Sequence, residues 1–175
     1  MIVRHFATST PLCRRILLAG LATGLVACDG GTDNPAHQAA SAAPTTVIAD
    51  KRWLDMHDPT PPEQWLASRE AARDLGRSAA TVASFGNLLA RAHRHYTETP
   101  RMIANRAAQI EEMLRARGID ESARLVIEGL VGAGSDERRR GFGEAGQHYF
   151  NIRMTGASRD QALQALARTA AETPR

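Results

Sequence analysis

The fold is decided by the stretch TPRMIANRAAQIEEMLRARG, which spans residues 99–118. Its apolar residues recur at spacings of four, three and four, at Ile103, Ala107, Ile110 and Leu114. This spacing places them on one face of an α-helix. Thr99-Pro100 before these apolar residues and Gly118 after them are typical helix start and stop signals. The stretch therefore predicts an amphipathic helix with one buried face.

The same helical signals recur on both sides of this stretch. Thr60-Pro61-Pro62-Glu63 and Ser158-Arg159-Asp160-Gln161 have the pattern of capping boxes, and Ser78 and Asp120 are candidate caps. Helices are expected over residues 60–75, 78–96, 99–118, 120–132, 142–156 and 158–170. No alternation typical of strands and no hairpin signal is present. The prediction is an all-α fold, a compact bundle of five or six short helices.

A basic segment followed by an apolar run opens the chain. The basic residues are Arg4, Arg14 and Arg15, the apolar run covers residues 16–27, and the run ends in Leu25-Val26-Ala27-Cys28. Twelve apolar residues are too few for a permanent membrane helix, which needs about 20. Their order after a basic segment is that of a signal peptide.

Residues 1–28 resemble the signal peptide and lipobox of the bacterial lipoprotein class. The resemblance implies cleavage before Cys28 and a diacylglyceryl group, with an added acyl chain, on the Cys28 thiol. It implies a chain anchored to a bacterial membrane through this lipid, with its domain in the periplasm. Asp29 resembles the signal that retains lipoproteins at the inner membrane of enteric bacteria, so the inner membrane is favoured over the outer.

The remaining chain divides by composition into a tether and a domain. Residues 28–52 contain few large apolar side chains and are expected to form a flexible tether with a reach of roughly 25 Å. Residues 53–175 are expected to form the helical domain. Core packing is the expected role of Trp53 and Trp65, with contact to the membrane interface as the alternative.

The charge balance argues against nucleic acid as a partner. The chain has 22 basic and 19 acidic residues, and three of the basic residues lie in the signal segment. The processed chain is therefore balanced and has no long-range attraction for phosphate. Residues 70–87 resemble a helix-turn-helix, but residues 78–87 carry no lysine or arginine to meet DNA. A DNA-binding regulator is the alternative if the signal peptide is spurious.

Two neighbouring groups of residues are candidates for a partner-binding surface. One is aromatic and the other cationic; together they are Phe142, His148, Tyr149, Phe150, Arg138, Arg139 and Arg140. Aromatic residues and arginine are favoured in protein interfaces. The alternatives are a core role for the aromatic residues and a solvated loop for the arginines.

Catalytic and metal sites are not predicted, and no cofactor is expected apart from the lipid. His93 and His95 are two apart, so on a helix they point in nearly opposite directions and cannot chelate one ion. The domain has no cysteine after Cys28 and no hydrolase or phosphate-loop motif. The expected function is a non-enzymatic binding, scaffold or assembly factor with an envelope protein as partner.

Two alternatives to this function remain open. Residues 53–59 after a lipobox and a short spacer faintly resemble the entry-exclusion lipoproteins of conjugative plasmids, which would imply a partner in a conjugation apparatus. The second alternative is an enzyme or small-ligand binder that uses His93, His95 and His148.

Overall fold

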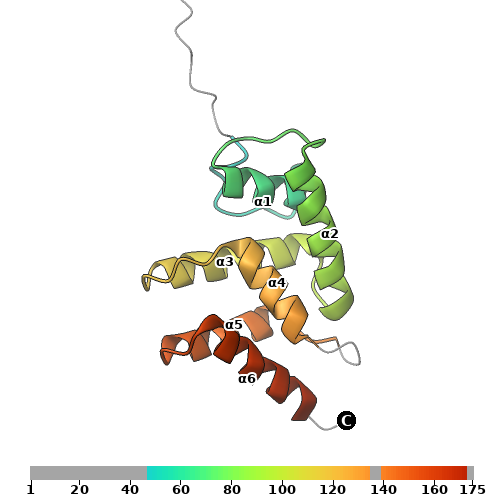
Figure 1. The fold of residues 1–175 in the computed structure, drawn as a ribbon. Helices are drawn as coiled ribbons and strands as arrows, with labels where there is room; N and C mark the ends of the chain where they lie inside the picture. Colours follow the sequence, from blue (N-terminus) through green and yellow to red (C-terminus); the bar gives the residue numbers. More distant parts are fainter. Residues whose placement is uncertain (1–46, 135–138, 173–175) are drawn as a thin grey trace, which may run out of the picture. The chain divides into compact units, whose positions relative to one another are not determined.

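The computed structural model describes residues 47–134 and 139–172, and these residues contain six α-helices and no strand (Figure 1). The helices are α1 (Pro62–Ala71), α2 (Ala80–His95), α3 (Pro100–Arg115), α4 (Ala123–Ala133), α5 (Phe142–Met154) and α6 (Arg159–Glu172). One isolated parallel bridge joins Tyr96 to Arg140. The all-α prediction is confirmed.

Helix α3 lies at the centre of the packing, where it contacts α1, α2, α4 and α5 (Figure 1). The apolar face predicted for α3 is buried, and Ala104 and Ala108 are buried beside it. Small side chains on α3 let neighbouring helices approach closely. Helix α6 packs against α4 and α5.

Three helix ends follow their sequence signals. The Thr99 hydroxyl accepts a hydrogen bond from the Met102 N–H and caps α3. Ser158 and Gln161 exchange reciprocal bonds, because each side chain accepts from the other's backbone N–H. After α3, Gly118 has φ +75°, and the Ile119 N–H donates to the Leu114 carbonyl. These contacts form a Schellman motif, which needs a left-handed residue that glycine adopts without strain.

The first helix is shorter than the sequence predicts. It begins after Pro61, which offers no side-chain cap, so Thr60 does not act as the predicted cap. It ends at Ala71 because Ala72 takes a left-handed conformation, with φ 50°. The Ser68 hydroxyl then accepts the Leu75 N–H, which holds the following loop against the helix.

Two further predicted caps are wrong by one or two residues. Helix α2 is preceded by Ala79 rather than Ser78, without a side-chain bond. The cap of α4 is Ser122, whose hydroxyl accepts the Leu125 N–H, rather than Asp120. The connection from α1 to α2 spans residues 72–79. It is longer than the three- to four-residue turn of a helix-turn-helix, which weakens that alternative.

Residues 47–60 precede α1 and lie against the helices as an ordered segment without helix, here called the strap. The tether predicted over residues 28–52 therefore overlaps the folded domain from residue 47 onward. None of the helices described is both long enough and apolar enough to cross a bilayer.

Candidate binding surfaces

The aromatic residues predicted at a partner surface belong mostly to the core. Phe142 and Tyr149 are 0% and 1% exposed, so they are closed to a partner. The Phe142 ring meets the Tyr96 ring edge to face, with centroids 5.1 Å apart. His148 and Phe150 are half-buried, and Phe150 packs against the core. The core alternative is therefore correct for Phe142 and Tyr149.

The Tyr149 hydroxyl belongs to a buried polar group that links the segment just before α4 to α5 and α6, here called the Glu121 cluster. Tyr149 donates to both Glu121 oxygens at 2.8 and 2.9 Å. Arg153 and Arg159 bind the same carboxylate at 2.5 and 3.3 Å. Glu121 is only 5% exposed. Burial is the largest cause, and the hydrogen bond to Glu121 the second, that raises the pKa of Tyr149 to about 12. The contacts occupy the carboxylate from several sides, which is typical of a structural role.

The described arginines of the predicted cationic group also make internal contacts. The Arg139 guanidinium donates to the carbonyls of His93 and Tyr96 at the end of α2. A cation in this place complements the negative end of the helix dipole. Arg140 reaches the Ala133 carbonyl at 3.5 Å. Arg138 lies outside the described residues.

The histidines do not form a metal site in the part of the chain that the structure describes. The His93 ring lies 2.8 Å from the Glu98 carbonyl oxygen, at the end of α2. His148 lies on α5. Among the described residues, no group of three or more histidine, cysteine, aspartate or glutamate side chains could hold an ion.

The strap is anchored at its start by one aspartate. The Asp74 carboxylate accepts the backbone N–H groups of Val47, Ile48 and Ala49 at 2.8–2.9 Å. The Ala49 N–H is the largest cause that lowers the pKa of Asp74. The Trp65 indole then donates to the Lys51 carbonyl at 2.9 Å.

Two side chains of α3 hold the second half of the strap, and an ion pair within the strap stabilises it further. The Asn105 side chain bonds both the N–H and the carbonyl of Leu54, each at 2.9 Å. Arg101 donates to the carbonyls of Asp55, Asp58 and Thr60. Lys51 pairs with Asp58 at 2.8 Å, and this hydrogen bond is the main cause that lowers the pKa of Asp58 to about 2.

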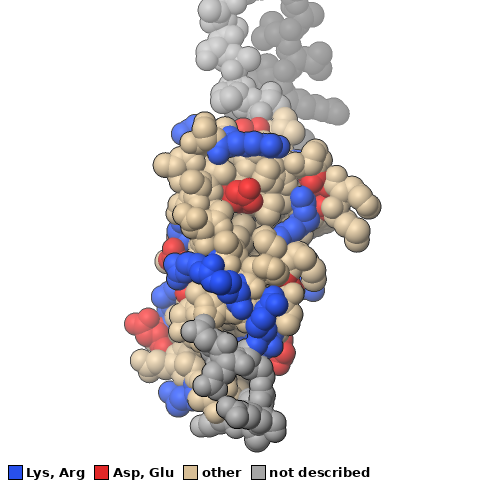
Figure 2. Space-filling model, turned by 90° about the vertical axis from the view of Figure 1, so that its right-hand side faces the viewer, with Lys and Arg blue, Asp and Glu red and all other residues tan. Residues whose placement is uncertain are grey.

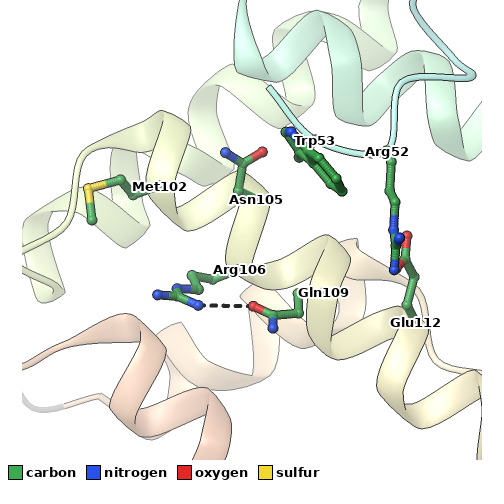
Figure 3. Close-up of a pocket in the computed structure, with 7 residues that line it drawn as sticks. All are labelled: Arg52, Trp53, Met102, Asn105, Arg106, Gln109 and Glu112. Atoms are coloured by element: carbon green, nitrogen blue, oxygen red, sulfur yellow. Dashed lines mark hydrogen bonds and ion pairs between the residues drawn. The ribbon is translucent and has the colours of Figure 1, made fainter. Parts of the chain in front are cut away.

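A cleft of about 460 Å³ lies between the strap and α3 (Figure 3). Its lining is Arg52, Trp53, Met102, Asn105, Arg106, Gln109 and Glu112. Figure 3 shows the Trp53 ring extending from the strap, with Asn105 on one side and the Arg52–Glu112 ion pair on the other. Arg106 bonds Gln109 at 3.0 Å, on the far side of the cleft from the strap.

Large apolar side chains are exposed at this cleft, which Trp53 and Met102 line, and elsewhere on the strap. Val47, Trp53, Met56 and Met102 are 61%, 56%, 83% and 49% exposed, and they are here called the strap surface. The expectation of a core role for Trp53 is therefore wrong, whereas Trp65 is fully buried. Sequence reasoning missed this surface, although Trp53 and Met56 flank an inward-facing Leu54 among charged residues.

A second exposed surface is the α2 outer face, formed by Ala83, Asn87, Ala90, Arg91 and Arg94. Figure 2 shows this side of the molecule, with blue side chains more prominent than red. The sequence has no acidic residue between Asp74 and Glu98. Arg91 and Arg94 have no ion-pair partner among the residues that the structure describes. The face therefore combines small side chains with positive charge.

The predicted lipidation residues Leu25, Val26, Ala27, Cys28 and Asp29 lie outside the described residues. The boundary at residue 28 and the anchor therefore stay predictions.

Comparison with known proteins gives this chain a family. Residues 63–171, from α1 into α6, match the family model described as MoxZ. The chain is 30% identical over 158 residues to Protein MoxZ of Paracoccus denitrificans, and the match covers 87% of this chain and 94% of that protein. No solved structure matches the chain. By the family match and the shared length, the chain belongs to the MoxZ family.

Proposed function

We propose that this chain is a non-enzymatic accessory protein of the bacterial envelope, anchored to a membrane through a lipid on Cys28. In this proposal the helical domain lies in the periplasm and acts by binding a protein partner. The inner membrane is the favoured location because Asp29 follows the lipidated cysteine.

The observation that carries the binding role is the α2 outer face. It presents Ala83, Asn87 and Ala90 along one stripe of a sixteen-residue helix, and Arg94 continues the stripe. Small side chains allow close approach of another helix, and arginine is enriched at interaction sites. With no acidic residue on α2, the expected partner presents carboxylates to this face.

The acidic and phenolic groups of the domain support binding over catalysis. The Glu121 carboxylate is enclosed by Tyr149, Arg153 and Arg159. Glu98 accepts the N–H groups of Phe142 and Gly143 at the start of α5. Burial raises the pKa of Glu98, but these hydrogen bonds outweigh it and hold the pKa below its usual value. Both carboxylates are engaged in holding helices together.

The first experiment is intact-mass analysis of the protein purified from its membrane fraction, beside a Cys28→Ala control. A species that begins at Cys28 and carries the mass of a diacylglycerol and an acyl chain supports the anchor. An unprocessed chain without added lipid contradicts it.

The second experiment tests the binding face by crosslinking in cells. A photo-reactive amino acid replaces Asn87, and the charge is reversed by Arg94→Glu. We expect a specific crosslinked product that is lost with Arg94→Glu and kept with Arg117→Glu, a reversal at an exposed arginine beyond α3. A product equally sensitive to both reversals, or no product, contradicts a partner at the α2 outer face.

A further inference from the structure

We propose that the strap surface rests on the phospholipid bilayer, with Trp53, Met56 and Met102 at the level of the lipid headgroups. The inference gives the domain a second, direct contact with the membrane besides the proposed lipid. It rests on the proposed function in one respect only: the proposed lipid on Cys28 keeps the strap within reach of the membrane.

The first argument is the uneven distribution of exposed apolar side chains. Five large apolar side chains are exposed among the described residues, and four of them form the strap surface. Three of these four lie within the ten residues 47–56. The fifth, Leu125, lies on α4. Trp53 and Met102 also line the same cleft. Exposed apolar side chains that concentrate in one segment mark a contact surface, whereas a single exposed apolar residue needs no explanation.

The second argument is that the strap holds these side chains in place before any contact forms. Leu54, between Trp53 and Met56, is 2% exposed, and Asn105 bonds its backbone on both sides. Arg101 binds three strap carbonyls, including that of Asp55 next to Met56. Because the segment is already ordered, insertion of its side chains costs little conformational entropy.

The third argument is the length of chain between the strap and the proposed anchor. Val47 follows Cys28 by nineteen positions. A tether of this length has an expected reach of roughly 25 Å. The strap is the first part of the described domain that this tether meets, so the anchor keeps it close to the membrane.

The chemistry of the strap surface fits the interfacial layer of a bilayer. Tryptophan favours this layer because its ring is apolar and its N–H is polar. Arg52 and Arg106 can keep their charges in water while their stems contact apolar groups. The charged Asp55 beside Met56 limits insertion to the headgroup level. Because the strap carries both acidic and basic residues, with Lys51 and Arg52 between Asp50 and Asp55, the contact is apolar in character and we expect it to be insensitive to salt.

The experiment uses the purified lipoprotein reconstituted into vesicles of phosphatidylethanolamine and phosphatidylglycerol, with a fraction of brominated phospholipid as quencher. The chain has two tryptophans, and Trp65 is fully buried. We expect bromolipid to quench the emission of Trp53 about twofold, and Trp53→Phe to remove this quenching. Emission that bromolipid leaves unchanged, while aqueous acrylamide still quenches Trp53, would overturn the proposal.

Matched variants separate insertion from simple anchoring. Met56→Ser removes an 83% exposed side chain and should lower the insertion equilibrium of the strap roughly tenfold. Leu125→Ser removes an exposed side chain on α4 and should leave Trp53 quenching unchanged. Equal effects of the two variants, or protection of Trp53 that rises with protein concentration before vesicles are added, would overturn the membrane contact. The second result would indicate contact between copies of the chain.

The mass of the same sample separates this proposal from the proposed function. If the mass shows a lipidated Cys28 and Trp53 is not quenched, the strap proposal fails alone. If the mass shows no lipid, the anchor fails, and quenching of Trp53 by added vesicles still tests the strap.

Discussion

The strap and the Glu121 cluster are both held by polar contacts between distant segments of the chain, but they differ in burial. Glu121 is 5% exposed, and its partners lie on α5 and α6. Asp74 and Asp58, which hold the strap, are half-buried and bind mainly backbone groups and Lys51. The same kind of bond therefore operates in a buried region and in a half-buried one.

This difference decides what each set of contacts contributes. A buried charge that loses its partner cannot be rescued by water, so the Glu121 cluster is essential to the packing of α4, α5 and α6. A partly exposed contact exchanges more easily with water, so we expect the strap contacts to order a local segment without controlling global stability. We expect mutations in the two regions to separate these outcomes.

The largest effect is expected from Glu121→Ala. The change leaves Arg153, with a side chain 11% exposed, beside the Tyr149 hydroxyl without their shared acceptor. We expect the free energy of unfolding to fall by about 3–5 kcal/mol, measured by urea denaturation. The control is Glu112→Ala, which removes a half-exposed partner of Arg52 and Arg69, leaves Arg69 paired with Glu111, and should cost less than about 1 kcal/mol. Similar losses for the two variants would contradict the comparison.

A smaller effect is expected from Tyr149→Phe, which keeps the ring and removes only the hydroxyl. The Glu121 carboxylate then loses one buried donor, and we expect a cost of about 2 kcal/mol by the same measurement. Tyr96→Phe removes a bond to the neutral Leu130 carbonyl and should cost about 1 kcal/mol. A larger loss of stability for Tyr96→Phe than for Tyr149→Phe would show that the charge of Glu121 does not strengthen its hydrogen bond with Tyr149.

The sequence predicts the apolar framework better than these polar contacts. Ile103, Ile110 and Leu114 are predicted to be buried because helical periodicity is local, and the structure buries them. The Leu54–Asn105 contact joins residues 51 positions apart and follows no period. No sequence signal distinguishes Glu121 from a surface carboxylate.

The candidate surfaces show the same limit. The seven-residue spacing of Phe142 and Tyr149 supports a common buried face, and the structure places both in the core. For Trp53, side-chain type alone favours the core, whereas the bonds of Asn105 to Leu54 turn its neighbour inward and leave Trp53 outside. A contact that depends on another element cannot be derived from local pattern.

A local effect without a large loss of stability is expected from Arg101→Ala. The change removes the donors to the Asp55, Asp58 and Thr60 carbonyls, so the backbone around Met56 should open more often. We expect amide exchange over residues 54–60 to rise about tenfold, while residues 103–114 keep their protection. Arg106→Ala, which loses only a bond to Gln109, is the control. Unchanged exchange in the strap would show that its other contacts, including those of Asn105 and the Lys51–Asp58 pair, hold it without Arg101.

The smallest effect is expected from the titration of the two carboxylates that hold the strap. The pKa of Asp74 is lowered by the N–H groups of Ala49, Val47 and Ile48, and that of Asp58 is lowered to about 2. A lowered pKa means that the contribution of each carboxylate is complete above its ordinary value near 4 and is lost as pH falls through its folded value. Amide resonances of Val47–Ala49 should therefore move as the pH falls below about 4 in an NMR titration. Asp74→Asn should abolish this movement, since the amide does not titrate, whereas movement that survives this change would place the titrating group elsewhere.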